Sequence, residues 1–253
     1  MKYFVEKGSI VRQIWGKSDT ILFMFAGAAA EFALNKAVDW LYFTGRLPED
    51  PLGRLFSTVS YARAIIFSED HAAVQAIDAM TAVHANVEAK RGKKIPDWAY
   101  RDVLFMLIDY SIRSFEVLER DLTNREKNEV FQVFKRVGTR MGISELPENI
   151  EQWSAMRQQH LRDNLKYSAF TKDLFIQYRK HLGPGRFKIL LEVQTVVVPH
   201  MVHQLLSFKK TSFLSPLIAL YKMMKQVNLD WFLKELILPP KYKRAINALD
   251  HPV

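Results

Sequence analysis

Apolar residues recur at intervals of three and four along most of the 253-residue chain, whereas the strict alternation that marks β-strands is nearly absent. This periodicity predicts an all-α fold with about eight or nine helices around one core. Hydrophobic residues make up 49% of the chain, which is enough to bury a substantial core. No repeat, Gly/Ser-rich linker or abrupt change of composition divides the chain, so residues 1–253 are predicted to form a single-domain helical bundle.

Capping and breaking residues set the predicted helix bounds. Thr123 and Glu126 match a capping box, in which each side chain satisfies a backbone N–H that a helix start leaves unbonded. Gly183-Pro184 ends one helix, and Pro199 bends another. The predicted helices cover residues 18–44, 52–66, 70–90, 98–120, 124–141, 147–167, 171–182 and 186–208, with two short helical segments at 216–226 and 229–236.

Several classes of chemistry are excluded by residues that the chain lacks. It has no cysteine, which excludes disulfides, thiolate metal sites, iron–sulfur clusters and cysteine nucleophiles. It has no Gly-rich phosphate loop, GxSxG elbow or HExxH helix. No histidine follows a glutamate by three residues, which argues against a di-iron bundle. Any metal must therefore be held by His, carboxylate or Tyr.

Charge and hydropathy give a weaker guide to partners. The net charge is +9, but basic residues are dispersed, with residues 90–94 as the densest run, so no nucleic-acid partner is expected. No apolar run suits a transmembrane helix, and residues 1–15 are too charged for a secretory signal, so a cytoplasmic location is expected. A peripheral membrane contact through the basic surface and residues 214–238 stays an alternative.

His84 interrupts an apolar stripe on the helix predicted over residues 70–90. The stripe consists of Ala73, Ile77, Met80, His84 and Val87, whose spacing places them on one inward face. An imidazole on such a face is costly unless a partner engages its ring nitrogens. The pattern leaves two partners open, a backbone carbonyl and an iron ion.

The other histidines carry weaker signals. His200 and His203 are one helical turn apart, a spacing that can hold a metal, but their apolar flanks favour a structural role. His71 and His160 stand among polar residues, and we expect both imidazoles to be solvated.

Small residues gather in one turn of the first long helix. Gly27 and the three alanines after it allow close approach of either another helix or a planar cofactor, and the sequence leaves both open. Glu31 follows directly and is a candidate acid or base.

Several motifs occur in a recognisable order. They are DPLGRLFST at residues 50–58, TAVH at 81–84 and DWAY at 97–100, followed by shorter matches near residues 122–126, 141–147 and 238–240. Together the motifs, over residues 14–244, resemble the family that contains latex clearing protein (rubber oxygenase) and the fungal mycophenolic-acid-pathway oxygenase.

The resemblance implies a globin-like helical core that holds haem b, with His84 as the iron ligand. It also implies that Arg54 and Thr58, one helical turn apart, face the haem pocket and serve catalysis. A guanidinium there can hold a propionate or polarise bound oxygen, and a hydroxyl can donate to an iron-bound ligand. Gly27 on the first helix and Met80 on the His84 helix are expected to contact the cofactor.

The implied activity is a haem-dependent oxygenation of an apolar, unsaturated small molecule of isoprenoid or lipid type by O2, with cleavage of a C=C bond as one outcome. Rubber oxygenases have a lysine where this chain has Ser57, a poor iron ligand, which points away from rubber itself. The alternative is a haem or hydrophobic-ligand binding protein or sensor without turnover.

Overall fold

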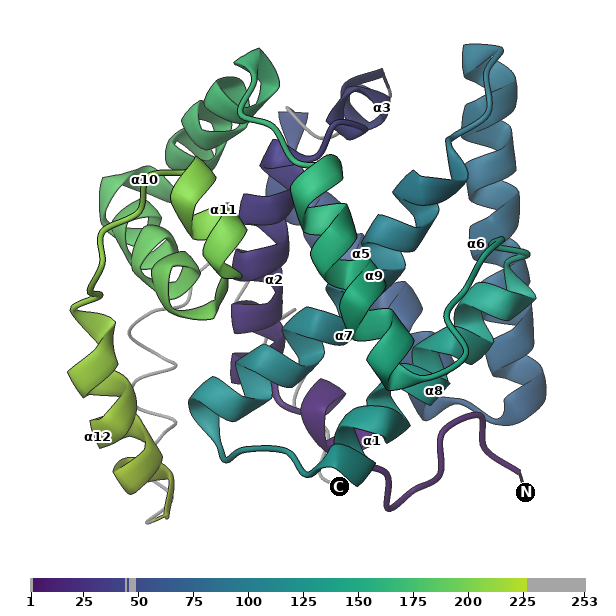
Figure 1. Ribbon diagram of the computed structural model, residues 1–253, viewed down its shortest axis with the longest axis horizontal. Coiled ribbons are helices and arrows are strands. Elements are labelled where there is room, and N and C mark those ends of the chain that lie inside the picture. Colours follow the sequence, from purple (N-terminus) through teal and green to yellow (C-terminus); the bar gives the residue numbers. More distant parts are fainter. Residues whose placement is uncertain (1, 44, 46–48, 227–253) are drawn as a thin grey trace.

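The computed structural model describes residues 2–43, 45 and 49–226, and the predicted all-α class is confirmed in this part of the chain (Figure 1). No β-strand occurs among these residues, and only two isolated bridges pair Tyr3 with Glu69 and Asn35 with Leu165. The helices are α1 (Ile10–Trp15), α2 (Ser18–Leu34), α3 (Val38–Phe43), α5 (Pro51–Phe67), α6 (Asp70–Arg91), α7 (Asp97–Leu118), α8 (Asn124–Arg140), α9 (Ile150–Asp163), α10 (Ala169–Val197), α11 (His200–Leu205) and α12 (Leu214–Gln226).

Helix α2 lies at the centre of the fold, between α7 and α10 (Figure 1). Gly27 makes this approach close, because a Cβ atom added there would lie 2.3 Å from Cε1 of Tyr110 on α7 and 3.0 Å from Val197 on α10. The small residues left open the close approach of either another helix or a planar cofactor. In this structure Gly27 packs against neighbouring helices. One main hydrophobic core joins α2 to most of the other helices.

Helices α5 and α6 form an antiparallel hairpin that carries the residues singled out by the sequence. Asp50 caps α5 by accepting a hydrogen bond of 2.9 Å from the Gly53 N–H, and Pro51 stands in the first turn. Ser68 and Glu69 connect the helices, which pack together. Gly92, in the left-handed conformation at φ 67°, ends α6.

The first predicted helix ends earlier than expected. The prediction ran to residue 44, but α2 ends at Leu34 and α3 is separate. Asn35 causes the break, since its side-chain oxygen accepts a 2.8 Å hydrogen bond from the Ala37 N–H and its amide donates to Asp102 on α7 at 2.8 Å. Helix α1, which was not predicted, buries Trp15 against Ser111.

The break predicted at Gly183 is confirmed. Gly183 has φ 75° and ψ 166° and divides α10, and the chain turns again at Pro199 before α11. None of the helices among the described residues is long and apolar enough to cross a membrane. The segment predicted at 229–236 lies outside the described residues. The globin-like core and the cytoplasmic location stay predictions.

Candidate haem site

His84 lies on the C-terminal half of α6, and α6 runs along one edge of the fold in Figure 1. The predicted stripe is fully buried at Ala73 and Ile77, partly buried at Met80 and half-buried at His84. The inward face is therefore confirmed for the first half of the stripe. His84 stands where the stripe leaves the core.

The His84 imidazole is oriented by its own helix. Its Nδ1 lies 2.8 Å from the carbonyl oxygen of Met80, one turn earlier. Because a carbonyl oxygen only accepts, this bond requires a proton on Nδ1, and in the neutral imidazole the lone pair then lies on Nε2. A backbone acceptor on one ring nitrogen is the usual arrangement behind a histidine that binds a metal through the other. Met80 thus contacts the imidazole through its backbone, and its predicted contact with the cofactor stays a prediction.

Tyr100 packs against the same imidazole from the first turns of α7. The two ring centroids are 5.4 Å apart at an interplanar angle of 64°, and the Tyr100 hydroxyl donates to Oε1 of Glu88 at 3.1 Å. Burial and this hydrogen bond raise the pKa of Tyr100, so the phenol stays a neutral donor. Glu88 also accepts from the Ile95 N–H at 2.8 Å. One carboxylate therefore ties the end of α6 to the start of α7 beside His84.

The end of α6 is held from the other side by α3. Arg91 donates to Asp39 at 2.6 Å, and its guanidinium carbon lies 4.0 Å from the ring centroid of Trp40. These contacts limit how far the last turns of α6 can move.

Thr58 and Arg54 lie on α5, the other arm of the hairpin. Arg54 lies 13 residues before the end of α5, and His84 lies 14 residues after the start of α6. At about 1.5 Å per helical residue, both backbones are about 20 Å from the turn that joins the two helices. Thr58 is half-buried one turn nearer that end. The Arg54 side chain lies outside what the structure describes, and its role stays a prediction.

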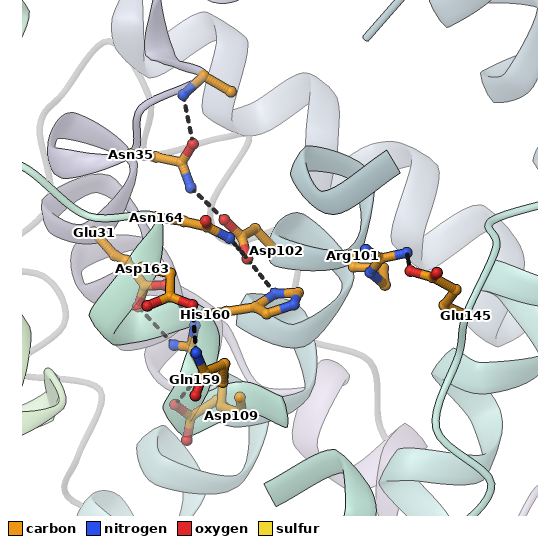
Figure 2. A network of polar contacts seen from close by, with 12 residues as sticks. Glu31, Asn35, Arg101, Asp102, Asp109, Glu145, Gln159, His160, Asp163 and Asn164 are labelled. Atoms are coloured by element: carbon orange, nitrogen blue, oxygen red, sulfur yellow. Dashed lines mark hydrogen bonds and ion pairs between the residues drawn. The ribbon is translucent and has the colours of Figure 1, made fainter. Parts of the chain in front are cut away.

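A second polar cluster, shown in Figure 2, joins α2, α7 and α9 in the interior. Arg157 donates to both carboxylate oxygens of Glu31, and Tyr110 donates to Glu31 Oε2 at 2.9 Å. Burial and the Glu31 charge raise the pKa of Tyr110 well above its usual value. Glu31, the candidate acid or base, thus lies in a buried ion pair.

His160 belongs to the same region, and the expectation of a solvated imidazole was wrong. Its side chain is 11% exposed, its Nδ1 is 2.5 Å from Oδ1 of Asp102, and its ring stacks on Phe105 at 5.1 Å. In Figure 2 the imidazole points to Asp102, which Asn35 and Asn164 also contact. The spacing in the sequence holds a signal for this burial. His160 is next to Leu161 and three residues after Arg157, on the side of α9 that is buried at these residues and at Trp153.

The described residues contain no group of three or more His, Cys, Asp or Glu side chains that could hold a metal ion. A haem iron is a different case, because the porphyrin supplies four ligands and one protein histidine suffices. The tautomer that the Met80 carbonyl imposes on His84 fits this requirement.

A comparison with protein families places the chain in a class of oxygenase domains. Residues 13–236 match the family described as ER-bound oxygenase mpaB/B'/Rubber oxygenase, catalytic domain. The chain belongs to this family, which confirms the resemblance drawn from its motifs. No curated protein and no solved structure shows a significant match.

Proposed function

We propose that the protein is a haem b-dependent oxygenase that acts with O2 on an apolar, unsaturated small molecule of isoprenoid or lipid type. The family supports an oxygenase. The hydrogen bond between His84 Nδ1 and the Met80 carbonyl is the observation that carries the cofactor assignment, because it presents Nε2 as the ligand nitrogen. Haem b, when bound, supplies the activation of O2.

The residues of the chain then have distinct tasks. His84 holds the iron, and Tyr100 and Glu88 keep its imidazole in place. Thr58 would supply a hydroxyl donor from α5, and Arg54 would supply a cation that holds a haem propionate. Ser57, where rubber oxygenases have a lysine, is a poor iron ligand and would not hold the iron.

Reconstitution with haem b tests the cofactor assignment. The wild-type protein should show a Soret band, and His84→Ala should weaken or shift it, with added imidazole restoring the wild-type spectrum. His71→Ala is the matched control, since His71 is an exposed histidine at the other end of α6. Absence of a Soret band in the reconstituted wild type would overturn the proposal.

Oxygen consumption tests turnover. The haem-loaded protein should consume O2 with an unsaturated isoprenoid and not with the saturated molecule of the same carbon skeleton. Carbonyl products at the former double bond would show C=C cleavage. A Soret band without O2 consumption for any unsaturated substrate would instead favour a haem-binding protein or sensor.

A further inference from the structure

Helix α12 turns an apolar face to the outside. Four large side chains on this face or directly before it are about half exposed or more: Phe213, which precedes the helix, at 46%, Leu217 at 47%, Leu220 at 48% and Met223 at 65%. Pro216 and Ala219, between them, are exposed as well, and no charged residue occurs from residue 211 to residue 221. A surface helix of a globular protein normally turns polar residues outward, so this face is unusual.

Two polar contacts fix this orientation, one within the helix and one directly before it. Tyr221 donates to Asp19 on α2 at 2.6 Å. Ser212, just before α12, donates to Glu192 on α10 at 2.7 Å. A rotation of α12 that buried Leu217 and Leu220 would break both contacts and expose Tyr221. The outward apolar face is therefore a consequence of how the helix is anchored. Helix α12 itself runs along the outer side of the fold (Figure 1).

The apolar face has a basic border. Lys209 and Lys210 are exposed directly before it, and Lys188 Nζ lies 5.6 Å from the centroid of the Phe213 ring. The nearby carboxylate of Glu192 is engaged by the Ser212 hydroxyl and by the Phe213 N–H at 3.1 Å. Apolar side chains flanked by lysines suit helices that lie in the interface of a bilayer with anionic headgroups.

We propose that α12 docks on the surface of a bilayer that contains anionic phospholipid. Phe213, Leu217, Leu220 and Met223 enter the boundary between headgroups and acyl chains, and Lys188, Lys209 and Lys210 meet the phosphates. The helix lies on the bilayer, in keeping with the lack of a spanning helix among the described residues. This inference goes beyond the proposed function and does not depend on haem, although an apolar substrate would dissolve in the same bilayer.

A site-specific fluorescent label tests which face docks. The chain has no cysteine, so Leu220→Cys can be labelled uniquely with an environment-sensitive dye in the full chain. We expect a blue shift on vesicles of phosphatidylcholine with about a third phosphatidylserine, and little change on phosphatidylcholine alone. Val83→Cys is the matched control, because Val83 is 50% exposed on α6, at the opposite edge of Figure 1.

Unlabelled variants give the affinities by co-sedimentation with the same vesicles. Leu217→Gln and Leu220→Gln should each weaken binding by about tenfold, while Val83→Gln leaves it unchanged. Lys209→Gln with Lys210→Gln should weaken binding by about fivefold per lysine, and high salt should abolish this difference. Lys93→Gln with Lys94→Gln, an exposed pair from the other basic run, should leave binding unchanged.

Several results would overturn the proposal. One is wild-type protein that does not sediment with anionic vesicles; another is binding with no change at the Leu220→Cys label. If the Leu220→Cys label reports an apolar environment already without vesicles, the face is covered by the chain itself. If the protein is a dimer that Leu220→Gln dissociates, the face binds a second copy. Vesicle binding should be measured both with and without haem. A protein that fails to bind vesicles is then distinguished from a protein that lacks a Soret band.

Discussion

Arg157 on α9 holds Glu31 on α2 through two hydrogen bonds of 2.6 Å between guanidinium nitrogens and carboxylate oxygens. The two side chains are only 2% and 1% exposed, and Asp109 accepts a third bond from Arg157 at 3.0 Å. Burial alone would lower the pKa of Arg157, but the charges of Glu31 and Asp109 raise it above its usual value. The cation thus stays charged inside the core, between three helices.

Removal of this cation should destabilise the protein strongly. Arg157→Met leaves two carboxylates buried, and we expect a loss of about 3–5 kcal/mol in the free energy of unfolding, measured with urea. Combining it with Glu31→Gln should restore part of that loss, because one of the uncompensated charges disappears. Arg113→Met, which removes the more exposed partner of Asp109, should cost less than about 1 kcal/mol. Additive losses in the double variant would argue against coupling.

Gly27 sets the distance between α2 and α7. Gly27→Ala would place a Cβ atom 2.3 Å from Cε1 of the buried Tyr110, so the helices must shift. We expect a loss of about 1–3 kcal/mol in the free energy of unfolding. Gly185→Ala is the control, because a Cβ atom there meets nothing within 4 Å. Equal stabilities of the two variants would contradict the tight contact at Gly27.

Tyr100 should act as a positioning residue for His84. Tyr100→Leu removes the ring that packs on the imidazole, whereas Tyr100→Phe keeps the ring and loses only the bond to Glu88. We expect the leucine variant to release haem faster and to show a shifted Soret band, with the phenylalanine variant between it and wild type. Haem transfer to an acceptor protein measures the release rate. Identical rates for all three proteins would exclude the role.

Thr58 and Ser57 are adjacent hydroxyl residues with different exposure. Thr58 is half-buried, whereas Ser57 is exposed. Thr58→Val, which keeps the shape and removes the hydroxyl, should lower O2 consumption by at least about tenfold while the Soret band persists. Ser57→Ala should leave turnover near the wild-type rate. A fully active Thr58→Val variant would remove the hydroxyl from the proposed catalytic role.

The capping box of α8 gives a pH-dependent contribution to stability. The carboxylate of Glu126 accepts hydrogen bonds from Arg120 and from the Thr123 N–H. These bonds, of which the one from Arg120 has the largest effect, lower the pKa of Glu126 to about 2. A carboxyl group whose pKa is lower in the folded state than in the unfolded state stabilises the folded state. This stabilisation is complete at pH values above the unfolded pKa and is lost as the pH falls through the folded pKa, here about 2.

The variant Glu126→Gln isolates this charge, because glutamine can keep the bond to the Thr123 N–H. At neutral pH we expect it to be less stable than wild type by no more than about 1 kcal/mol, since the Arg120 side chain is 55% exposed. Urea unfolding from pH 7 to pH 2 should show the difference shrink steadily below pH 4.5, the usual pKa of a glutamate. A difference at pH 2 as large as that at pH 7 would contradict this origin.

Local signals made much of the fold predictable from the sequence. The Thr123–Glu126 box, the break at Gly183 and the bounds of α5 and α6 depend on residues within a few positions of each other, so the local sequence pattern contains them. The stripe through His84 was visible for the same reason, and the ordered motifs identified the family.

Long-range partners decided the rest. Asn35 ends α2 because Asp102, 67 residues away, accepts from its amide. Glu31 has a buried ion-pair partner because the fold brings Arg157, 126 residues further along the chain, next to it. His160 is buried because α9 packs it onto Phe105. Asn35 and Glu31 are placed by the hydrogen-bond and charge partners that tertiary packing brings to them, and these partners leave no periodic mark near either residue in the sequence.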